Sequence, residues 1–177
     1  MSSLDDQDRR LLDLVQVNSR LSYAELGEQI GLSASAVHER LRKLQAQGVI
    51  RGFGARLDPR ALGLDLCAFI QVLIDRPEHD TTFVAAMETL PEVLECHHTT
   101  GNYSYLLKVR THDVHSLERL IARSIKSLPG AVRTLTTVAL STAKETGAVA
   151  VETPSENSAT SSRAGRAGRP KRPRWED

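Results

Sequence analysis

The chain has 177 residues, of which 40% are hydrophobic and 25% are charged. These are ordinary proportions for a soluble protein of one or two domains. The N-terminus lacks the basic start and apolar run of a secretory signal. The longest apolar stretch, Leu66 to Ile74, is far shorter than the roughly 20 residues that a membrane helix needs. Cys67 and Cys96 lie in strand-like segments and are predicted to be thiols. We therefore expect a cytoplasmic protein without a membrane partner.

The formal net charge of +1 is unevenly distributed. Residues 153–177 contain six basic and three acidic side chains, a net charge of +3, which leaves −2 for residues 1–152. Ser, Ala, Thr and Gly dominate the start of this region, so we predict a disordered basic tail over residues 146–177.

The segment RAGRPKRPR of this tail resembles an AT-hook, which lies in narrow minor grooves. A flexible tail that binds phosphates without specificity is the favoured alternative, because short basic motifs are common. The AT-hook interpretation would involve Gly168, Arg169, Pro170 and Lys171.

The first sixty residues predict three helices followed by a short extended segment. Asp5 can cap the first helix, and Ser22 with Glu25 forms a capping box for the second. Gly31 ends the second helix, and Ser33 can cap a third helix that starts at once. Two short helices joined by a three-residue turn containing glycine are typical of a helix-turn-helix, whose second helix enters the major groove of DNA.

The third predicted helix ends near Gly48 and has two faces. Ala34, Val37, Leu41 and Leu44 recur at helical spacing and are expected to pack inward. The opposite face carries hydroxyl, imidazole and cationic donors for phosphates and base edges, and a helix N-terminus can bind a phosphate. A solvated surface is the simpler interpretation of this face, but the tight turn favours DNA contact. Glu39 can accept from a cytosine amino group or pair with Arg42 or Lys43. The predicted DNA-binding residues are Ser22, Ser33, Ser35, His38, Glu39, Arg42 and Lys43.

After Pro59 the pattern changes to strands that alternate with helices. Strands are predicted at 66–74, 93–100, 103–110 and 132–140, and helices at 81–89 and 113–127. The order βαββαβ is that of a ferredoxin-like fold, in which helices cover one face of an antiparallel sheet. The open face is expected to be covered by another subunit, which predicts a homodimer or larger homo-oligomer. The predicted domains are 1–60, 61–145 and the tail 146–177, and the fold class is α+β.

Several segments of the chain resemble one family in order and spacing. They are LDDQDRRLLDLV, then LSYAELGEQIGLSASAVHERLRKLQAQGVI with the following LDP, then PEVLECHHTTGNYSYLLKV and the late LPG. From about Leu4 to about Lys144 the chain resembles the Lrp/AsnC family of feast-or-famine regulators. The resemblance implies a winged helix-turn-helix, a long linking strand and a ferredoxin-like (RAM) domain that pairs into dimers and often octamers. It also implies double-stranded DNA as partner, a nucleoid-associated location and an amino-acid effector bound between regulatory domains.

Matching positions to the family places the effector-binding loop at residues 100–104, with Thr136 on the last strand as a second wall. Where the family usually has an acidic residue, this sequence has Ser104. A carboxylate there would pair with an effector ammonium group, whereas serine offers a neutral hydroxyl. The effector-binding residues implied by the resemblance are Thr100, Gly101, Asn102, Tyr103, Ser104 and Thr136.

Two clusters invite a metal interpretation, and neither is favoured. On a strand, Cys96 and His98 point away from Glu95 and His97. A helix start capped by Asp113 explains the second cluster, His112, His115 and Glu118, without a metal. The Gly52-Phe53-Gly54 segment lacks the third glycine of a dinucleotide loop and predicts a turn or wing. No metal or cofactor is expected.

The sequence predicts a sequence-specific, effector-modulated transcription regulator. The alternative is an architectural DNA-compacting protein that needs no effector, which Ser104 and the basic tail favour. An enzyme is disfavoured because no nucleophile elbow, P-loop or paired catalytic carboxylates occur. RNA binding is disfavoured because residues 103–109 lack the basic-glycine-aromatic signature of RNA-recognition strands.

Overall fold

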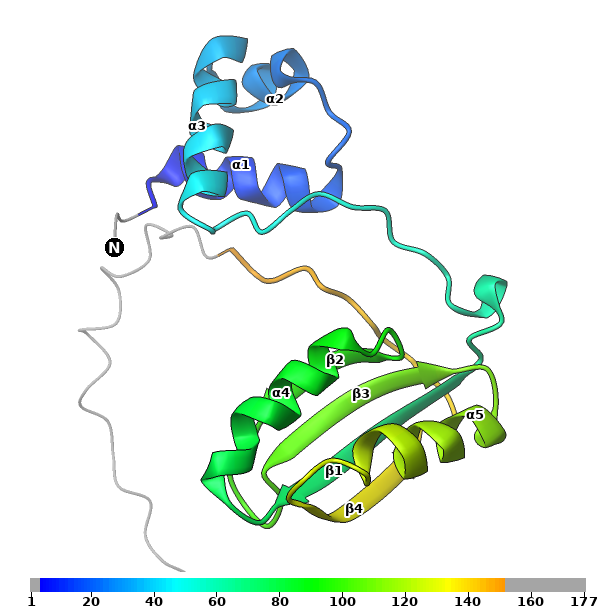
Figure 1. Ribbon diagram of the computed structural model, residues 1–177. Helices are drawn as coiled ribbons and strands as arrows, with labels where there is room; N and C mark the ends of the chain where they lie inside the picture. The colour runs from blue at the N-terminus through cyan, green and yellow to red at the C-terminus, as the bar shows by residue number, and fades with distance from the viewer. Residues whose placement is uncertain (1–3, 152–177) are drawn as a thin grey trace, which may run out of the picture. The chain divides into compact units, whose positions relative to one another are not determined.

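The computed structural model of the protein describes residues 4–151, which form two compact units (Figure 1). The helical unit comprises the chain up to Gly54 together with the segment that starts at Thr146, and the sheet unit comprises Ala55–Glu145. The sequence placed domain boundaries after residues 60 and 145. Within the described residues, no helix combines the length and apolarity that would let it cross a membrane.

The helical unit contains α1 (Asp6–Val17), α2 (Tyr23–Ile30) and α3 (Ala34–Ala46), and each helix starts where its cap predicted. The Asp5 carboxylate accepts the backbone N–H of Asp8, and the Asp8 carboxylate accepts that of Asp5, which completes a capping box. The predicted box of Ser22 and Glu25 is formed at α2. Ser33 caps α3 by accepting the N–H of Ala36. These local contacts confirm the three predicted helix starts.

The turn between α2 and α3 depends on two glycines. Gly31 ends α2 with a φ of 72°, in the left-handed region that glycine adopts without strain. The N–H of Leu32 then bonds to the carbonyl of Gly27 at 2.9 Å. A Cβ atom placed on Gly27 would lie 2.3 Å from the carbonyl oxygen of Leu32. The turn can therefore pass this close to α2 only because position 27 has no side chain.

The core of the helical unit combines apolar side chains from all three helices. Val37, Leu41 and Leu44 of α3 are buried as predicted, but Ala34 is exposed in the first turn and does not join them. Residues 51–58 contain no β-strand in this structure, so the wing and linking strand implied by the resemblance are not formed in the described chain. The buried residues of this core are Leu11, Leu12, Val15, Leu26, Ile30, Val37, Leu41, Leu44 and Ile50.

The chain after Thr146 was predicted to be disordered, but residues 146–151 lie on the helical unit. The Gln16 side-chain amide bonds to both the N–H and the carbonyl of Val149, and Val151 packs against the helical core. Disorder was inferred from composition, which does not record these contacts. The rest of the predicted tail, including the AT-hook-like residues Gly168, Arg169, Pro170 and Lys171, lies outside the described residues.

The sheet unit confirms the predicted ferredoxin-like order. Its elements are β1 (Leu66–Ile74), α4 (Asp80–Thr89), β2 (Val93–His98), β3 (Tyr105–Thr111), α5 (Val114–Arg119) and β4 (Ala131–Val138). Short 3₁₀ turns lie at Arg60–Leu62 and Pro77–His79. The strands are antiparallel in the order β2-β3-β1-β4. The predicted single helix over residues 113–127 is instead α5 followed by a π-helical stretch, Leu120–Ile125.

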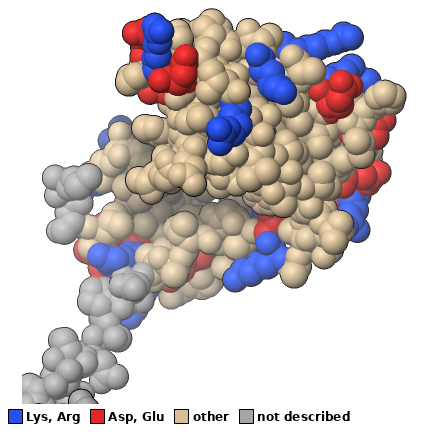
Figure 2. Space-filling model, turned by 90° about the horizontal axis from the view of Figure 1, so that it is seen from below, with Lys and Arg blue, Asp and Glu red and all other residues tan. Residues whose placement is uncertain are grey.

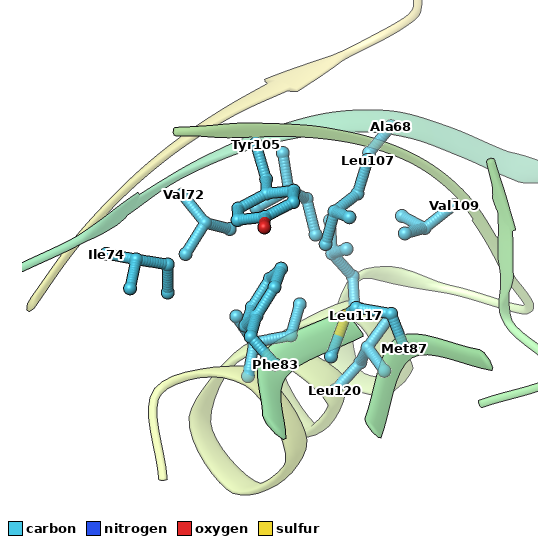
Figure 3. Packing of buried hydrophobic residues seen from close by; sticks show 12 residues of the cluster. Ala68, Val72, Ile74, Phe83, Met87, Tyr105, Leu107, Val109, Leu117 and Leu120 are labelled. Atoms are coloured by element: carbon cyan, nitrogen blue, oxygen red, sulfur yellow. The ribbon is translucent and has the colours of Figure 1, made fainter. Parts of the chain in front are cut away.

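Helices α4 and α5 cover one face of the sheet (Figure 1). Figure 3 shows Phe83 and Met87 of α4 directed toward the strands, where the Phe83 and Tyr105 rings lie 4.8 Å apart. Burial, with a smaller effect of Asp80, raises the pKa of the Tyr105 hydroxyl. On the other face, Phe69 and Leu135 remain 38% and 47% exposed. Apolar side chains on an open sheet face are the feature from which self-association was predicted.

Glu145, the last residue of the sheet unit, takes part in an ion-pair network. Its carboxylate contacts Lys108 and lies 2.8 Å from Arg110, which is buried. Lys108 also contacts Glu95 at 2.9 Å. The hydrogen bonds from Lys108 and Arg110 lower the pKa of Glu145 below its ordinary value of 4.5. The carboxylate thus places one negative charge between two cations of β3.

Replacing Gly27 by alanine tests the close approach at the turn. The new Cβ would meet the Leu32 carbonyl, which belongs to the backbone, so Gly27→Ala should destabilise the helical unit by about 1–3 kcal/mol. Gly52→Ala is the control, because position 52 has no neighbour within 4 Å and no positive φ. Urea unfolding followed by circular dichroism measures both variants. Equal stability of the two variants would show that the turn is not constrained at Gly27.

The Glu145 network predicts an acid dependence of stability. A carboxyl group with a lowered folded pKa stabilises the protein above its unfolded pKa, and this contribution disappears as the pH falls through the folded value. Wild-type stability should therefore fall as the pH drops below about 4.5. Glu145→Gln should be less stable than wild type at pH 7 and should lose less on acidification. Urea unfolding at a series of pH values measures the difference, and parallel curves would contradict the role of Glu145.

Candidate DNA-binding surface and effector loop

One face of α3 carries the residues predicted to contact DNA. Their side chains are exposed, whereas the opposite face is buried in the helical core. Spacings of three and four residues place these side chains on one side of the helix. The structure therefore brings together five of the seven predicted DNA-binding residues on α3: Ser35, His38, Glu39, Arg42 and Lys43.

The other two predicted residues, Ser22 and Ser33, cap helices. The Ser22 hydroxyl accepts the backbone N–H of Glu25 and donates to its carboxylate at 2.7 Å, and these bonds lower the pKa of Glu25. The Ser33 hydroxyl accepts the N–H of Ala36 at 3.2 Å and lies 3.0 Å from the hydroxyl of Ser35. Both hydroxyls are thus engaged in hydrogen bonds within the protein. Each fixes the start of a helix, and the helix N-terminus is the group that they would position at a DNA surface.

Glu39 pairs with Arg42 in the DNA-free protein. The Arg42 guanidinium donates two bonds to the carboxylate, at 3.2 and 2.9 Å, and lowers the pKa of Glu39. Both side chains are about two-thirds exposed, so water screens the pair and its contribution to stability is small. The guanidinium can exchange this partner for a phosphate or a guanine edge. Of the two cationic side chains that the sequence offered Glu39 as partners, Arg42 and Lys43, the structure shows the pairing with Arg42.

Sequence analysis missed two residues that position α3. Tyr23, at the start of α2, contacts His38 in a tilted arrangement with 5.1 Å between ring centroids. Arg40 lies 2.7 Å from both Asp5 and Asp8 and connects α3 to the N-terminus of α1. The aspartates raise the pKa of Arg40 further. Both contacts join residues of different helices, so spacing along one helix does not predict them. The one available signal was that Arg40 lies between core residues of α3, which indicates that its side chain is not fully solvated.

The helical unit has a balanced charge. Residues 4–54 contain seven basic and seven acidic side chains. Figure 2 shows the molecule from below the view of Figure 1, a face on which Lys and Arg side chains are scattered, some of them beside Asp or Glu, with broad areas of other residues between them. Residues 4–54 therefore offer phosphates no large net positive charge, and what they present on α3 is a local arrangement of cationic and polar side chains.

The predicted effector loop connects β2 and β3 at one end of the sheet. Thr100, Gly101 and Asn102 are exposed, and Gly101 has a φ of 113°, a conformation that favours glycine. The loop is closed by the N–H of Thr99, which bonds to the carbonyl of Ser104 at 2.8 Å. The Thr99 hydroxyl also donates to the carbonyl of Tyr103. This loop is a small, well-bonded turn with its tip in solvent.

Ser104 fastens the effector loop to the end of β1. Its hydroxyl accepts the N–H of Ile74 at 3.0 Å and lies 3.4 Å from the Ile74 carbonyl, and its N–H bonds to the carbonyl of Val72. Thr136 pairs with Ile70 on the opposite side of β1, so the central strand separates it from the loop. Within one protomer, residues 100–104 therefore form one loop, and Thr136 does not lie beside this loop.

Several of the histidines and cysteines in the described chain have local partners. His97 lies 3.2 Å from Glu95, Cys96 packs against the core, and His98 stacks on Tyr105 with 5.0 Å between centroids. Burial raises the pKa of Cys96. In residues 4–151 no three His, Cys, Asp or Glu side chains are grouped as a metal site would require. His112 contacts the carbonyl of Gly63 at 2.8 Å.

A helix-turn-helix with an exposed second helix, joined to a ferredoxin-like unit, defines a two-domain DNA-binding transcription regulator. Family models match both parts: the AsnC-type helix-turn-helix domain over residues 4–45 and the Lrp/AsnC ligand binding domain over residues 67–149. The chain belongs to the Lrp/AsnC family. Members of this family are transcription regulators, and the chain is not an enzyme.

Named relatives support this assignment along most of the chain. The leucine-responsive regulatory protein of Salmonella typhimurium is 35% identical over 152 residues, which cover 85% of this chain and 93% of that protein. A transcriptional regulator of Neisseria meningitidis in complex with L-methionine has a TM-score of 0.78 and 32% identity, over 84% of this chain and 97% of the other. Escherichia coli AsnC has a TM-score of 0.76 and 30% identity, over 82% and 97%. The similarity thus extends over both units.

Arg42 provides the direct test of the α3 surface. Arg42→Ala should weaken binding to operator DNA by about 1–3 kcal/mol, or roughly tenfold or more, because a guanidinium contact to DNA is lost. Arg76→Ala is the matched control, since Arg76 is also an exposed arginine paired with a glutamate, Glu78, but lies in the sheet unit. Fluorescence anisotropy with labelled duplex DNA measures both. Equal affinity of the two variants would remove Arg42 from the interface.

Proposed function

We propose that this protein is a sequence-specific transcription regulator whose DNA binding is modulated by an amino acid bound at the loop of residues 100–104. The observation that carries the proposal is the match of both units to a family of regulators with a ligand-binding domain. Two structural relatives, from Neisseria meningitidis and Mycobacterium tuberculosis, are described as complexes with L-methionine. These complexes support an amino acid as the effector class.

In this proposal α3 lies in the major groove. His38 is held by Tyr23, so its ring reaches a base edge or phosphate without losing much side-chain freedom. Arg42 and Lys43 supply cations, and the N-terminus of α3 beside Ser33 and Ser35 supplies backbone donors for a phosphate. Phosphate contacts fix the orientation, and the side chains on α3 specify the sequence.

The effector loop would bind an amino acid chiefly through its backbone. The exposed tip at Thr100, Gly101 and Asn102 leaves room for a ligand beside the main chain. Ser104 contributes no charge, because its hydroxyl is neutral, and this hydroxyl is already bonded to the Ile74 backbone. The ammonium group of the effector would then need an acceptor from outside this loop. A homodimer or larger assembly, formed through the open face with Phe69 and Leu135, is proposed to supply further walls of the site.

Ser104 also favours a second candidate, an architectural DNA-compacting protein in the cytoplasmic nucleoid that needs no effector. A serine engaged at Ile74 stabilises the loop without a ligand. The six basic residues within 153–177 would add affinity that does not depend on sequence. The two candidates differ in one observable property, which is the response of DNA binding to amino acids.

Binding of the full chain to the promoter region of its own gene, by gel shift with each amino acid in turn, separates the candidates. A regulator should show a midpoint or a complex size that changes with one or a few amino acids, by about tenfold in affinity for a coupling of 1–3 kcal/mol. It should also prefer this DNA to a scrambled duplex. An unchanged shift with every amino acid and no preference between the duplexes would establish the architectural candidate instead.

Gly101→Ala tests the loop itself. The φ of 113° is strained for any residue with a side chain, so the substitution should distort the loop and abolish the amino-acid response while DNA binding without effector stays unchanged. Gly63→Ala is the matched control, because Gly63 also has a positive φ in the sheet unit but lies away from the loop. The titration above measures both. A normal response in Gly101→Ala would place the effector site elsewhere.

A further inference from the structure

The helical stretch that follows β3 departs from a regular α-helix at a point where it carries two arginines. After α5, Leu120–Ile125 is π-helical, and the N–H of Lys126 bonds to the carbonyl of Ile121, five residues earlier, at 2.8 Å. Turns of this kind are rare and frequently occur at functional sites. Here the stretch directs Arg119 and Arg123, four positions apart, to the same cavity of the sheet unit.

The cavity has a volume of about 510 Å³ and a largely apolar wall. Its lining comes from three parts of the sheet unit: residues 57–64 before β1, the strand ends at 91–94 and 110–112, and residues 116–124. The volume lies within the range of roughly 300–1,000 Å³ that is usual for small-molecule sites. The apolar wall includes five leucines, and the first, second and fourth of them are more than half exposed: Leu57, Leu62, Leu64, Leu94 and Leu120.

The polar groups of the cavity are mainly cations and donors. Arg119 donates to the Ser116 hydroxyl at 2.9 Å, and within residues 4–151 neither Arg119 nor Arg123 forms an ion pair. Glu92 is the acidic residue of the lining. With histidine counted as neutral and Arg110 paired with Glu145, the lining carries two positive charges and one negative charge, a net charge of +1. This charge favours an anion.

Arg110 adds a buried donor to the same wall. Its side chain is only 7% exposed, and one terminal nitrogen bonds to Glu145 at 2.8 Å. Its Nε is buried and has no hydrogen-bond partner in the described part of the chain. A buried donor without an acceptor is unfavourable, and an ionised carboxylate supplies acceptors only. The wall therefore holds donor capacity that the described residues do not use.

The cavity and the loop of residues 100–104 lie at opposite ends of the sheet. The loop connects the end of β2 to the start of β3, whereas the cavity is lined by the start of β2 and the end of β3. The seven residues of β3 span roughly 20 Å at about 3.3 Å per residue. A ligand in the cavity would therefore not contact this loop in the same protomer.

We propose that this cavity is a second small-molecule site, which binds an apolar monocarboxylate. Arg119 and Arg123 bind the carboxylate, because the guanidinium group presents a planar fork of donors that matches two carboxylate oxygens. The leucines cover the hydrocarbon part of the ligand. The net charge of +1 distinguishes this ligand from a zwitterionic amino acid. The inference is independent of the effector proposed for residues 100–104, because the two sites share no residue.

Isothermal titration calorimetry of the full chain with hexanoate tests the site. Hexanamide, which has the same chain without the charge, should bind about tenfold more weakly than hexanoate. Arg123→Glu should weaken hexanoate binding about tenfold or more, because a cation is replaced by an anion. Lys126→Glu is the matched control, since Lys126 is an exposed cation beside the same π-helical stretch and does not line the cavity. Equal binding by the two variants, or no binding of hexanoate to the wild type, would overturn the proposal.

Two further variants separate the site from folding and from the effector loop. Leu62→Gln should weaken hexanoate binding about threefold without shifting the thermal transition, because Leu62 is 55% exposed. Leu140→Gln, at a fully exposed leucine outside this cavity, should bind as the wild type does. Hexanoate binding should also be unchanged in Gly101→Ala, whatever that variant's response to amino acids. A loss of hexanoate binding in Gly101→Ala would place the carboxylate at the loop and overturn the proposal.

Discussion

The backbone of the turn between α2 and α3 passes over Gly27 at a distance that excludes any side chain. This close approach, with the left-handed Gly31, determines where α3 starts and how it leaves α2. The apolar face of α3 then fills the core, and Arg40 connects the helix to α1 through Asp5 and Asp8. The exposed face of α3 follows from these constraints, because a helix held on one side can present only the other. The surface that α3 presents is thus a consequence of backbone packing as much as of the identity of its exposed side chains.

The two central strands of the sheet are β1 and β3, and the sheet unit is organised around β1. The β1 side chains that face α4 and α5 are buried. At the C-terminal end of β1, the backbone N–H of Ile74 donates a hydrogen bond to the hydroxyl of Ser104. Ser104 therefore stabilises the position of the effector loop, whereas an acidic residue at this place would offer charge to a ligand. The two roles compete for the same side chain. In this chain the serine hydroxyl is engaged in holding the loop to the backbone of Ile74.

Local signals in the sequence were sufficient for the helix starts and for most of the sheet. Asp5, Ser22 and Ser33 act within three residues of themselves, so their capping bonds could be predicted from spacing alone. The apolar run from Leu66 to Ile74 gave β1 its correct bounds, because nearly all of its side chains are buried or half-buried. The assignment of residues 100–104 to an effector loop came from the family resemblance, carried by motifs such as GNYSY, and it stays a prediction; no periodicity would have indicated it.

The parts that could not be predicted depend on contacts between distant residues. The ring contact of Tyr23 with His38 and the pairing of Arg40 with Asp5 join separate helices. Composition suggested disorder from residue 146, but a single glutamine on α1 and one valine attach the chain as far as residue 151. Thr136 was assigned to the effector site by position, and only the strand order shows that β1 separates it from the loop in one protomer. These are properties of tertiary structure, which spacing along the chain does not record.

Amide hydrogen exchange of the full chain, with promoter DNA and with L-methionine added separately, tests the central claim most directly. The account predicts that DNA slows exchange across residues 33–43 of α3 and that an amino-acid effector slows exchange at residues 99–104. Reduced exchange confined to the sheet unit when DNA is added, with α3 unaffected, would contradict the assignment of α3 as the DNA-binding helix.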